Sequence, residues 1–105
     1  MHINSKLYSG TLYVVLNGEL DENAALYARE TLDRLFATSG VKQIIIDLSQ
    51  LDFMDSTGIG LFIGRYKRMQ KLGVPIFVTN PSSQIEKIFN MTGLYKIMPK
   101  IAQED

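Results

Sequence analysis

The sequence predicts an α/β domain in which a small mixed β-sheet packs against helices. Two observations support this fold class, and a third bears on the number of domains. Short apolar segments with strand-like composition alternate with longer segments whose apolar residues recur at helical spacing. Glycine or a helix-capping residue stands at many of the boundaries between them. The 105 residues show no internal repeat and no linker, so we expect residues 1–105 to form a single domain.

The first third of the chain should contain two strands and a helix. Residues 3–8 and 11–17 are the two predicted strands, and Ser9-Gly10 between them indicates a hairpin. The second strand is apolar on both sides, so we expect it to lie inside the sheet. Residues 22–38 follow with apolar residues at helical spacing and form the first predicted helix.

Two further strand–helix units should follow. Residues 42–48 form the third predicted strand, and the second predicted helix runs from Ser56 or Thr57 to about residue 72. A fourth strand is expected over residues 74–79. Because helices connect the second, third and fourth strands, these three strands should be parallel, and the first hairpin should add an antiparallel edge.

The last part of the chain is expected to begin with a third helix that ends at Gly93. Ser83 and Glu86 have the spacing of a capping box at its start. A short edge strand is expected over residues 95–98, followed by a polar tail over residues 100–105. The sheet would then have four to five strands.

The composition argues against several classes of function. Eleven basic residues balance eleven acidic ones, so no net charge draws the chain to nucleic acid or to an anionic membrane. The absence of cysteine excludes disulfides and thiol catalysis, and it makes the cytoplasm the expected location. The longest apolar run, residues 12–16, is too short to span a bilayer, and the N-terminus lacks the apolar core of a signal peptide.

The polar turn between the third strand and the second helix is the candidate functional site. Asp55, Ser56 and Thr57 lie there, and each of these side chains can cap a helix. A hydroxyl at a helix start lies beside free backbone N–H groups, where negative charge is stabilised. From the residues alone, a structural cap explains Ser56 better than a regulatory role, and nothing in the spacing separates Ser56 from Thr57 as a site of modification.

The second predicted helix has two different faces. The core side is expected to contain Ile59, Phe62, Ile63, Tyr66 and Met69. The opposite side contains Gly60, Gly64, Lys67 and Lys71, with Leu61 and Arg68 beside them. Glycine costs roughly 1 kcal/mol relative to alanine inside a helix, so two glycines one turn apart indicate close packing, either within the domain or against a partner. The lysines on the same side favour a partner.

Enzymatic and cofactor chemistry has little support. A serine hydrolase needs a base for Ser56, and the only histidine, His2, lies at a terminus that we expect to be mobile. Gly58, Gly60 and Gly64 are one residue off the spacing of a dinucleotide-binding loop, so no cofactor is expected.

Two alternative functions remain open from the residues. One is a receiver-like domain phosphorylated on aspartate, with Asp47 or Asp55 as the acceptor. Such a domain needs an acidic pair after an early strand to hold Mg²⁺, and residues 8–10 supply none. Asp47, Asp52 and Asp55 lie at a strand end and in a turn, where solvated carboxylates are usual, so no metal site is expected. The other alternative is an interaction module that is never phosphorylated, in which Ser56 is only a cap.

Four segments resemble the STAS-domain anti-sigma factor antagonists, also called anti-anti-sigma factors: Gly18-Glu19-Leu20-Asp21, Phe53-Met54-Asp55-Ser56-Thr57-Gly58-Ile59-Gly60, Gly64-Arg65-Tyr66-Lys67 and Phe89-Asn90-Met91-Thr92-Gly93-Leu94. The resemblance runs over nearly the whole chain in order, and it is greatest to the sporulation type, the antagonists of the anti-sigma F factor. It implies a STAS-like fold, which agrees with the pattern of strands and helices above. Members of the family usually have a longer C-terminal helix, whereas this sequence ends at Asp105.

The resemblance also implies a regulatory protein rather than an enzyme. In that family the unphosphorylated protein binds an anti-sigma factor that is also a serine protein kinase, and so releases the sigma factor. The kinase phosphorylates the serine after the aspartate, which here is Ser56, and a PP2C-type phosphatase reverses the reaction. Asp21 would belong to the partner-binding loop, although it can also cap the first helix. The residues expected to bind the partner are Asp21, Asp55, Thr57, Gly58, Gly60, Leu61 and Gly64.

Overall fold

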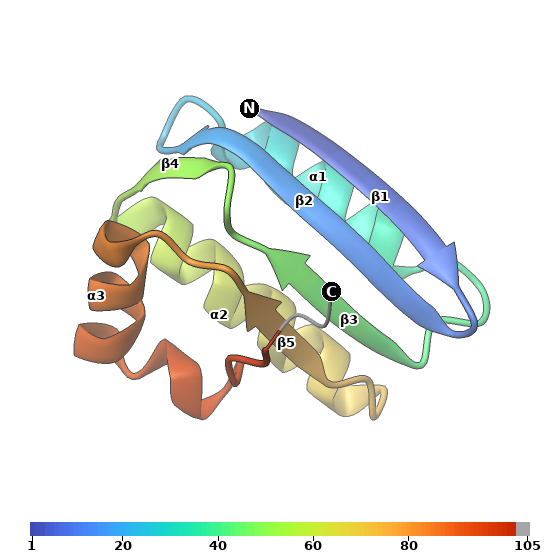
Figure 1. Ribbon diagram of the computed structural model, residues 1–105. Coiled ribbons are helices and arrows are strands. Elements are labelled where there is room, and N and C mark those ends of the chain that lie inside the picture. Colours follow the sequence, from blue (N-terminus) through green and yellow to red (C-terminus); the bar gives the residue numbers. More distant parts are fainter. Residues whose placement is uncertain (103–105) are drawn as a thin grey trace.

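The structure is a computed structural model that describes residues 1–102 (Figure 1). Its strands are β1 (His2–Tyr8), β2 (Thr11–Leu20), β3 (Gln43–Asp47), β4 (Leu51–Met54) and β5 (Ile76–Thr79). Its helices are α1 (Ala25–Phe36), α2 (Ser56–Lys71) and α3 (Ser83–Thr92), and a single 3₁₀ turn, η1 (Leu94–Lys96), follows α3. No helix within residues 1–102 is long and apolar enough to cross a membrane.

Strand β2 is the centre of a five-stranded mixed sheet. β1 pairs with it in the antiparallel direction through the hairpin at Ser9 and Gly10, which both have positive φ. β3 pairs in parallel with β2, and β5 pairs in parallel with β3, which gives the order β1-β2-β3-β5. The predicted mixed sheet is therefore confirmed, with β2, β3 and β5 as the three predicted parallel strands. His2, the first residue of β1, pairs with Asn17 of β2, so the expectation of a mobile N-terminus is wrong.

The predicted turn between β3 and α2 contains the strand β4, which the sequence analysis does not identify. β4 pairs in parallel with the last residues of β2, with Leu20 opposite Met54. It lies on the same side of β2 as β3, but further along it (Figure 1). The two end residues of β4 are buried and its two middle residues are exposed, so it has neither the alternation nor the continuous apolar run that identifies a strand.

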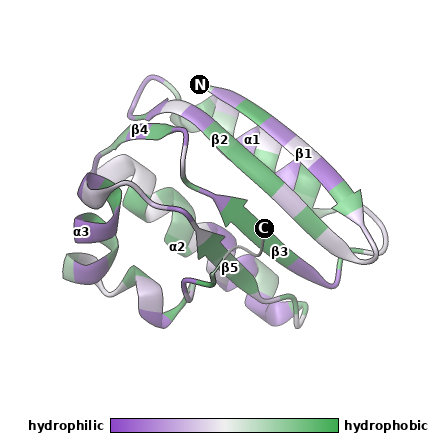
Figure 2. Ribbon diagram, in the orientation of Figure 1, coloured by the Kyte–Doolittle hydropathy of each residue, from purple (hydrophilic) through white to green (hydrophobic). Residues whose placement is uncertain are grey.

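Helices α1 and α2 lie side by side on one face of the sheet (Figure 1), and the core fills the space between sheet and helices. Leu16 of β2, Ile44 of β3 and Phe62 of α2 are fully buried there. Figure 2 shows the hydrophobic residues gathered in β2, β3 and β5, the strands against which the helices pack. Because the helices are amphipathic, their outer faces remain polar and available to solvent.

The predicted core side of α2 is confirmed. Phe62 and Met69 are buried, and the other predicted core residues of the helix, Ile59, Ile63 and Tyr66, are partly buried against the core. Leu61 differs from the expectation: it is only 8% exposed, although the sequence analysis places it beside the outer stripe of glycines and lysines. Leu61 belongs to the core because it faces α1, a neighbour that the helical wheel of α2 alone cannot indicate.

The predicted edge strand over residues 95–98 is wrong. Gly93 adopts a left-handed conformation (φ 76°), and the chain then turns into η1. Tyr95 packs against Phe89 with 5.1 Å between ring centroids, and its hydroxyl donates a hydrogen bond to Oε1 of Glu86 (3.2 Å). Burial raises the pKa of Tyr95 to about 12, and the Glu86 carboxylate adds to this shift.

Of the predicted polar tail, residues 103–105 lie outside the described part of the chain.

The predicted capping box at the start of α3 is also wrong. Ser82, not Ser83, is the N-cap, and its Oγ accepts a hydrogen bond from the backbone N–H of Ile85 (3.3 Å). The side chain of Glu86 does not reach back to the cap, because it bonds to Tyr95 and to the ammonium group of Lys100. The hydrogen bond from Lys100 lowers the pKa of Glu86.

Candidate functional site

The C-terminal ends of β2 and β4 bring the starts of two helices together. Leu20 pairs with Met54, and the backbone N–H of Asp55 reaches the carbonyl of Leu20 (3.5 Å). Asp21 and Asp55 therefore follow neighbouring parallel strands at one edge of the sheet. α1 and α2 begin within a few residues of these two aspartates. The predicted partner-binding residues at positions 21 and 55 thus lie close together, although they are far apart in sequence.

The N-cap of α2 is Asp55. Its backbone is extended (φ −110°, ψ −167°), and its Oδ1 accepts hydrogen bonds from the N–H groups of Thr57 (2.9 Å) and Gly58 (3.4 Å). Ser56 is consequently the first residue of the helix, and it is exposed. The predicted position of Ser56 at the exposed start of α2 is confirmed. Its interpretation as a structural cap is wrong, because Asp55 holds that position.

Asp21 closes the turn that leads into α1. Its Oδ1 accepts a hydrogen bond from the backbone N–H of Ala24 (3.1 Å), and the helix begins at the next residue, Ala25. This start is three residues later than the sequence predicts. Asp21 is half-buried, so part of its side chain remains accessible. A supporting role in the turn is therefore compatible with the predicted contact to a partner.

The three glycines in the first half of α2 lie in different surroundings. A Cβ on Gly58 would lie 2.4 Å from Cγ of Met54 and 3.0 Å from the carbonyl oxygen of Leu20. Gly58 is buried and allows α2 to pack closely against β4 and β2. A Cβ on Gly60 or Gly64 would meet nothing within 4 Å. No neighbour within residues 1–102 therefore requires a glycine at these two positions, and close packing against a partner stays a prediction.

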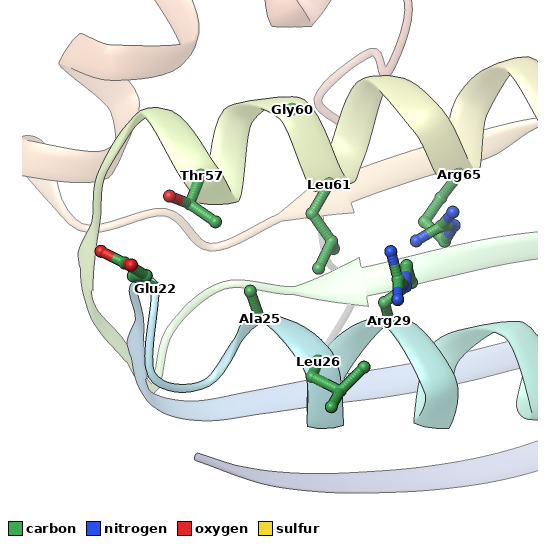
Figure 3. Close-up of a pocket in the computed structure, with 8 residues that line it drawn as sticks. All are labelled: Glu22, Ala25, Leu26, Arg29, Thr57, Gly60, Leu61 and Arg65. Atoms are coloured by element: carbon green, nitrogen blue, oxygen red, sulfur yellow. The ribbon is translucent and has the colours of Figure 1, made fainter.

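A groove of about 490 Å³ lies between α1 and α2 (Figure 3). Its lining includes the predicted residues Thr57, Gly60 and Leu61. The remaining lining residues are Glu22, Ala25, Leu26, Arg29 and Arg65. Figure 3 shows Thr57 and Glu22 at one end and the guanidinium groups of Arg29 and Arg65 approaching each other at the other end. The groove therefore has polar groups at both ends and an apolar middle.

The arginine end of the groove has more positive than negative charge. Asp33 of α1 lies 3.0 Å from Nε of Arg65 and 3.4 Å from Nη1 of Arg68, measured from the same oxygen, so one carboxylate serves two guanidinium groups. Burial lowers the pKa of Arg65; Asp33 raises it, and Arg68 and Arg29 lower it further. Arg29 is exposed and forms no ion pair with any residue in the range 1–102.

Glu22 and Arg29 were not among the site residues predicted from the sequence. Arg65 follows Leu61 by four positions and Thr57 by eight, so helical spacing places all three on one side of α2. The missing information was which side of α1 faces them. The sequence gives a partial indication of that side, because Ala25 and Arg29 are four residues apart and so lie on one side of α1.

The residues near Ser56 offer little for catalysis. His2, the only histidine, lies in β1 and does not line the groove. The Asp47 carboxylate accepts a hydrogen bond from the backbone N–H of Ser49 (2.8 Å), and the Asp55 carboxylate caps α2. Within the described range 1–102, no three side chains of His, Asp or Glu come together to hold a metal ion. An exposed hydroxyl beside an open groove is thus the main chemical feature of the site.

A mixed sheet with two helices on one face, and a groove near an exposed serine, define a small α/β domain. The STAS domain matches residues 2–104, and the chain belongs to this family. The family resemblance found in the sequence is therefore confirmed.

The chain is similar to curated proteins that are named antagonists of anti-sigma factors. An anti-sigma F factor antagonist from Paenibacillus polymyxa is 33% identical over 99 residues, covering 94% of this chain and 85% of that protein. An anti-sigma-B factor antagonist from Bacillus subtilis (strain 168) is 31% identical over 105 residues, covering 100% of this chain and 94% of that protein. These relatives carry the names of regulatory proteins, not of enzymes.

The fold is similar to that of SpoIIAA, an anti-sigma factor antagonist whose structure has been solved with and without phosphate. The unphosphorylated form has a TM-score of 0.78 and 28% identity, covering 99% of this chain and 90% of that chain. The phosphorylated form, from Bacillus, has a TM-score of 0.72 and the same identity, covering 99% of this chain and 93% of that chain.

Proposed function

We propose that this chain is an anti-sigma factor antagonist that is controlled by phosphorylation of Ser56. In this proposal, the unphosphorylated form binds an anti-sigma factor that is also a serine protein kinase, and a sigma factor is thereby released. The observation that carries the proposal is the position of Ser56, exposed at the first residue of α2 and directly after the capping Asp55. The names of the relatives and the phosphorylated form of SpoIIAA support it.

The surroundings of Ser56 explain why a phosphate would switch binding off. A phosphate adds about −1.5 to −2 charges. The helix start offers it little compensation, because Asp55 already accepts the hydrogen bonds of Thr57 and Gly58 and is itself negative. The phosphate therefore turns toward solvent, where it meets any protein bound over the start of α2. A penalty of about 2.7 kcal/mol in that interface corresponds to roughly a hundredfold loss of affinity.

The switch resets when a PP2C-type phosphatase removes the phosphate. An exposed residue at a helix start is accessible to both enzymes without unfolding of the core. The cap does not depend on the Ser56 hydroxyl, so adding or removing the phosphate leaves the hydrogen bonds of Asp55 in place. We therefore expect the folded domain to survive the complete cycle.

The test begins with phosphorylation by a purified anti-sigma factor kinase of the anti-sigma F class in the presence of ATP. Mass spectrometry should locate one phosphate on Ser56, and Ser56→Ala should carry none. A phosphate that survives acid treatment is expected for serine, whereas a phosphate that acid removes would support the alternative of an aspartyl phosphate. A phosphate found only on Thr57 would also contradict the assignment.

The second part of the test is calorimetric titration of the kinase with the phosphorylated and the unmodified chain. The phosphorylated chain should bind about a hundredfold more weakly. Ser56→Ala should bind and stay bound when ATP is present, and Ser56→Asp should bind poorly. Equal affinities of the phosphorylated and unmodified chains would show that Ser56 is not the switch.

A further inference from the structure

We infer that the arginine end of the groove between α1 and α2 binds a carboxylate side chain of the anti-sigma factor. This inference rests on the proposed function and adds a second contact to the one at Ser56. Arg29 and Arg65 line the groove from opposite helices, and their guanidinium groups approach each other there (Figure 3). Two like charges held side by side across a groove are stabilised by an anion placed between them.

The charges around this end of the groove leave room for one more carboxylate. Arg65 and Arg68 share Asp33, and Arg29 forms no ion pair within residues 1–102. The other acidic lining residue, Glu22, lies at the opposite end, beside Thr57 (Figure 3). Three guanidinium groups therefore face a single carboxylate. A partner carboxylate would find the exposed guanidinium of Arg29 without an ion pair of its own within residues 1–102, beside that of Arg65.

The shape of the groove favours a protein side chain as the source of the anion. Ala25, Gly60 and Leu61 form its middle, and a Cβ on Gly60 would meet nothing within 4 Å. The absence of side-chain bulk at Gly60 keeps this middle open. The apolar residues offer contact for the methylene groups of a glutamate or aspartate, while the guanidinium groups receive its charge. Leu26, which is 58% exposed at the groove, adds apolar surface for the remainder of the partner.

The position of the groove links it to the switch. Thr57 lines one end of the groove and directly follows Ser56 in α2. Arg65 lies eight residues further along the same helix, or about 12 Å at the rise of an α-helix. A partner that covers the start of α2 can therefore reach both ends with one element of its own. The carboxylate contact would set the direction in which that element lies across α1 and α2.

The test uses variants of Arg29 in the full chain. Arg29→Gln should weaken binding to the anti-sigma factor about tenfold, and Arg29→Glu about a hundredfold. Arg34→Gln is the matched control, because Arg34 is an exposed arginine of the same helix and does not line the groove. It should bind like the unmodified chain. The affinity of Arg29→Gln should also depend less on salt concentration, since one screened ion pair is lost.

A charge exchange identifies the occupant. Each exposed Asp or Glu of the anti-sigma factor is replaced by Arg and titrated against Arg29→Glu, and one replacement should restore at least tenfold of the lost affinity. If no position restores it, or if Arg29→Gln binds as tightly as Arg34→Gln, the inference is overturned. The proposed function stands in that case, provided that the unmodified chain binds and Ser56→Asp binds poorly. If the unmodified chain binds no anti-sigma factor, both proposals fail.

Discussion

The two faces of α2 use glycine for opposite purposes. On the buried face, Gly58 allows the helix to touch Met54 and the backbone of Leu20, so the missing side chain serves the packing of the domain. On the other face, a Cβ added at Gly60 or Gly64 would meet nothing within 4 Å, and each glycine costs the helix roughly 1 kcal/mol relative to alanine. A glycine inside a helix therefore indicates close approach only after its surroundings are known. The four predictions below test this difference between the faces.

The largest effect is expected from Phe62→Ala on the buried face. Phe62 is fully buried, and its ring lies 5.7 Å from that of Phe89, measured between centroids. Its loss would leave a cavity between α2 and α3, and we expect the free energy of unfolding to fall by about 3–5 kcal/mol. Urea unfolding followed by circular dichroism measures it. A loss below about 1 kcal/mol would show that this face of α2 contributes little to the core.

Gly58→Ala should also destabilise the domain, by about 1–3 kcal/mol. The new methyl group would overlap Cγ of Met54, and the backbone oxygen of Leu20 on its other side cannot move without disturbing β2. The same unfolding experiment measures the change. If Gly58→Ala were neutral or stabilising, close packing could not be the reason for this glycine, and the contrast with Gly60 would disappear.

Gly64→Leu should change binding rather than stability. The open space at Gly64 accepts the larger side chain, so the free energy of unfolding should change by less than about 1 kcal/mol. If a partner lies on this face, the leucine obstructs it, and affinity for the anti-sigma factor should fall at least tenfold, or about 1.4 kcal/mol. Both the melt and the titration are required. A loss of stability without a loss of affinity would contradict the partner interpretation.

The smallest expected effect is an increase in the free energy of unfolding. Gly60→Ala should stabilise the domain by about 0.5–1 kcal/mol, because alanine is the better helix former and its methyl group meets no neighbour. Compared with Gly58→Ala, the same substitution two residues apart should have the opposite sign. A destabilisation at Gly60 would mean that both glycines serve the internal packing of the helix.

Much of the fold follows from the sequence, because short apolar segments of strand-like composition identify β1, β2, β3 and β5, and apolar residues at period 3.6 identify the three helices. β4 does not follow from it, because its burial depends on pairing with the end of β2, a contact between residues far apart in the chain. The predicted strand after Gly93 failed for a related reason. Its apolar residues suit a strand, but the left-handed glycine turns the chain into η1.

The site, like β4, depends on contacts between residues far apart in the chain, which local sequence patterns do not give. Asp55, Ser56 and Thr57 can all cap a helix, and local chemistry does not choose among them. The choice is made by the pairing of Leu20 with Met54, which makes Asp55 the first residue beyond the strand. The family resemblance could single out Ser56 without this information, since it compares positions rather than contacts. The groove depends on how α1 lies against α2, which the local pattern of either helix indicates only in part.

The unequal pairing of β2 has a consequence for motion. Over its first residues β2 is paired on both edges, with β1 and β3, whereas the only strand that β4 pairs with within residues 1–102 is β2, over the last residues of β2 and with a shift of register at Gly18 and Glu19. Amide hydrogens of β2 should therefore exchange with solvent only when the whole domain unfolds, and those of β4 through local opening of much lower free energy. The strand that leads to Ser56 would then detach and return many times during the lifetime of a single folded molecule.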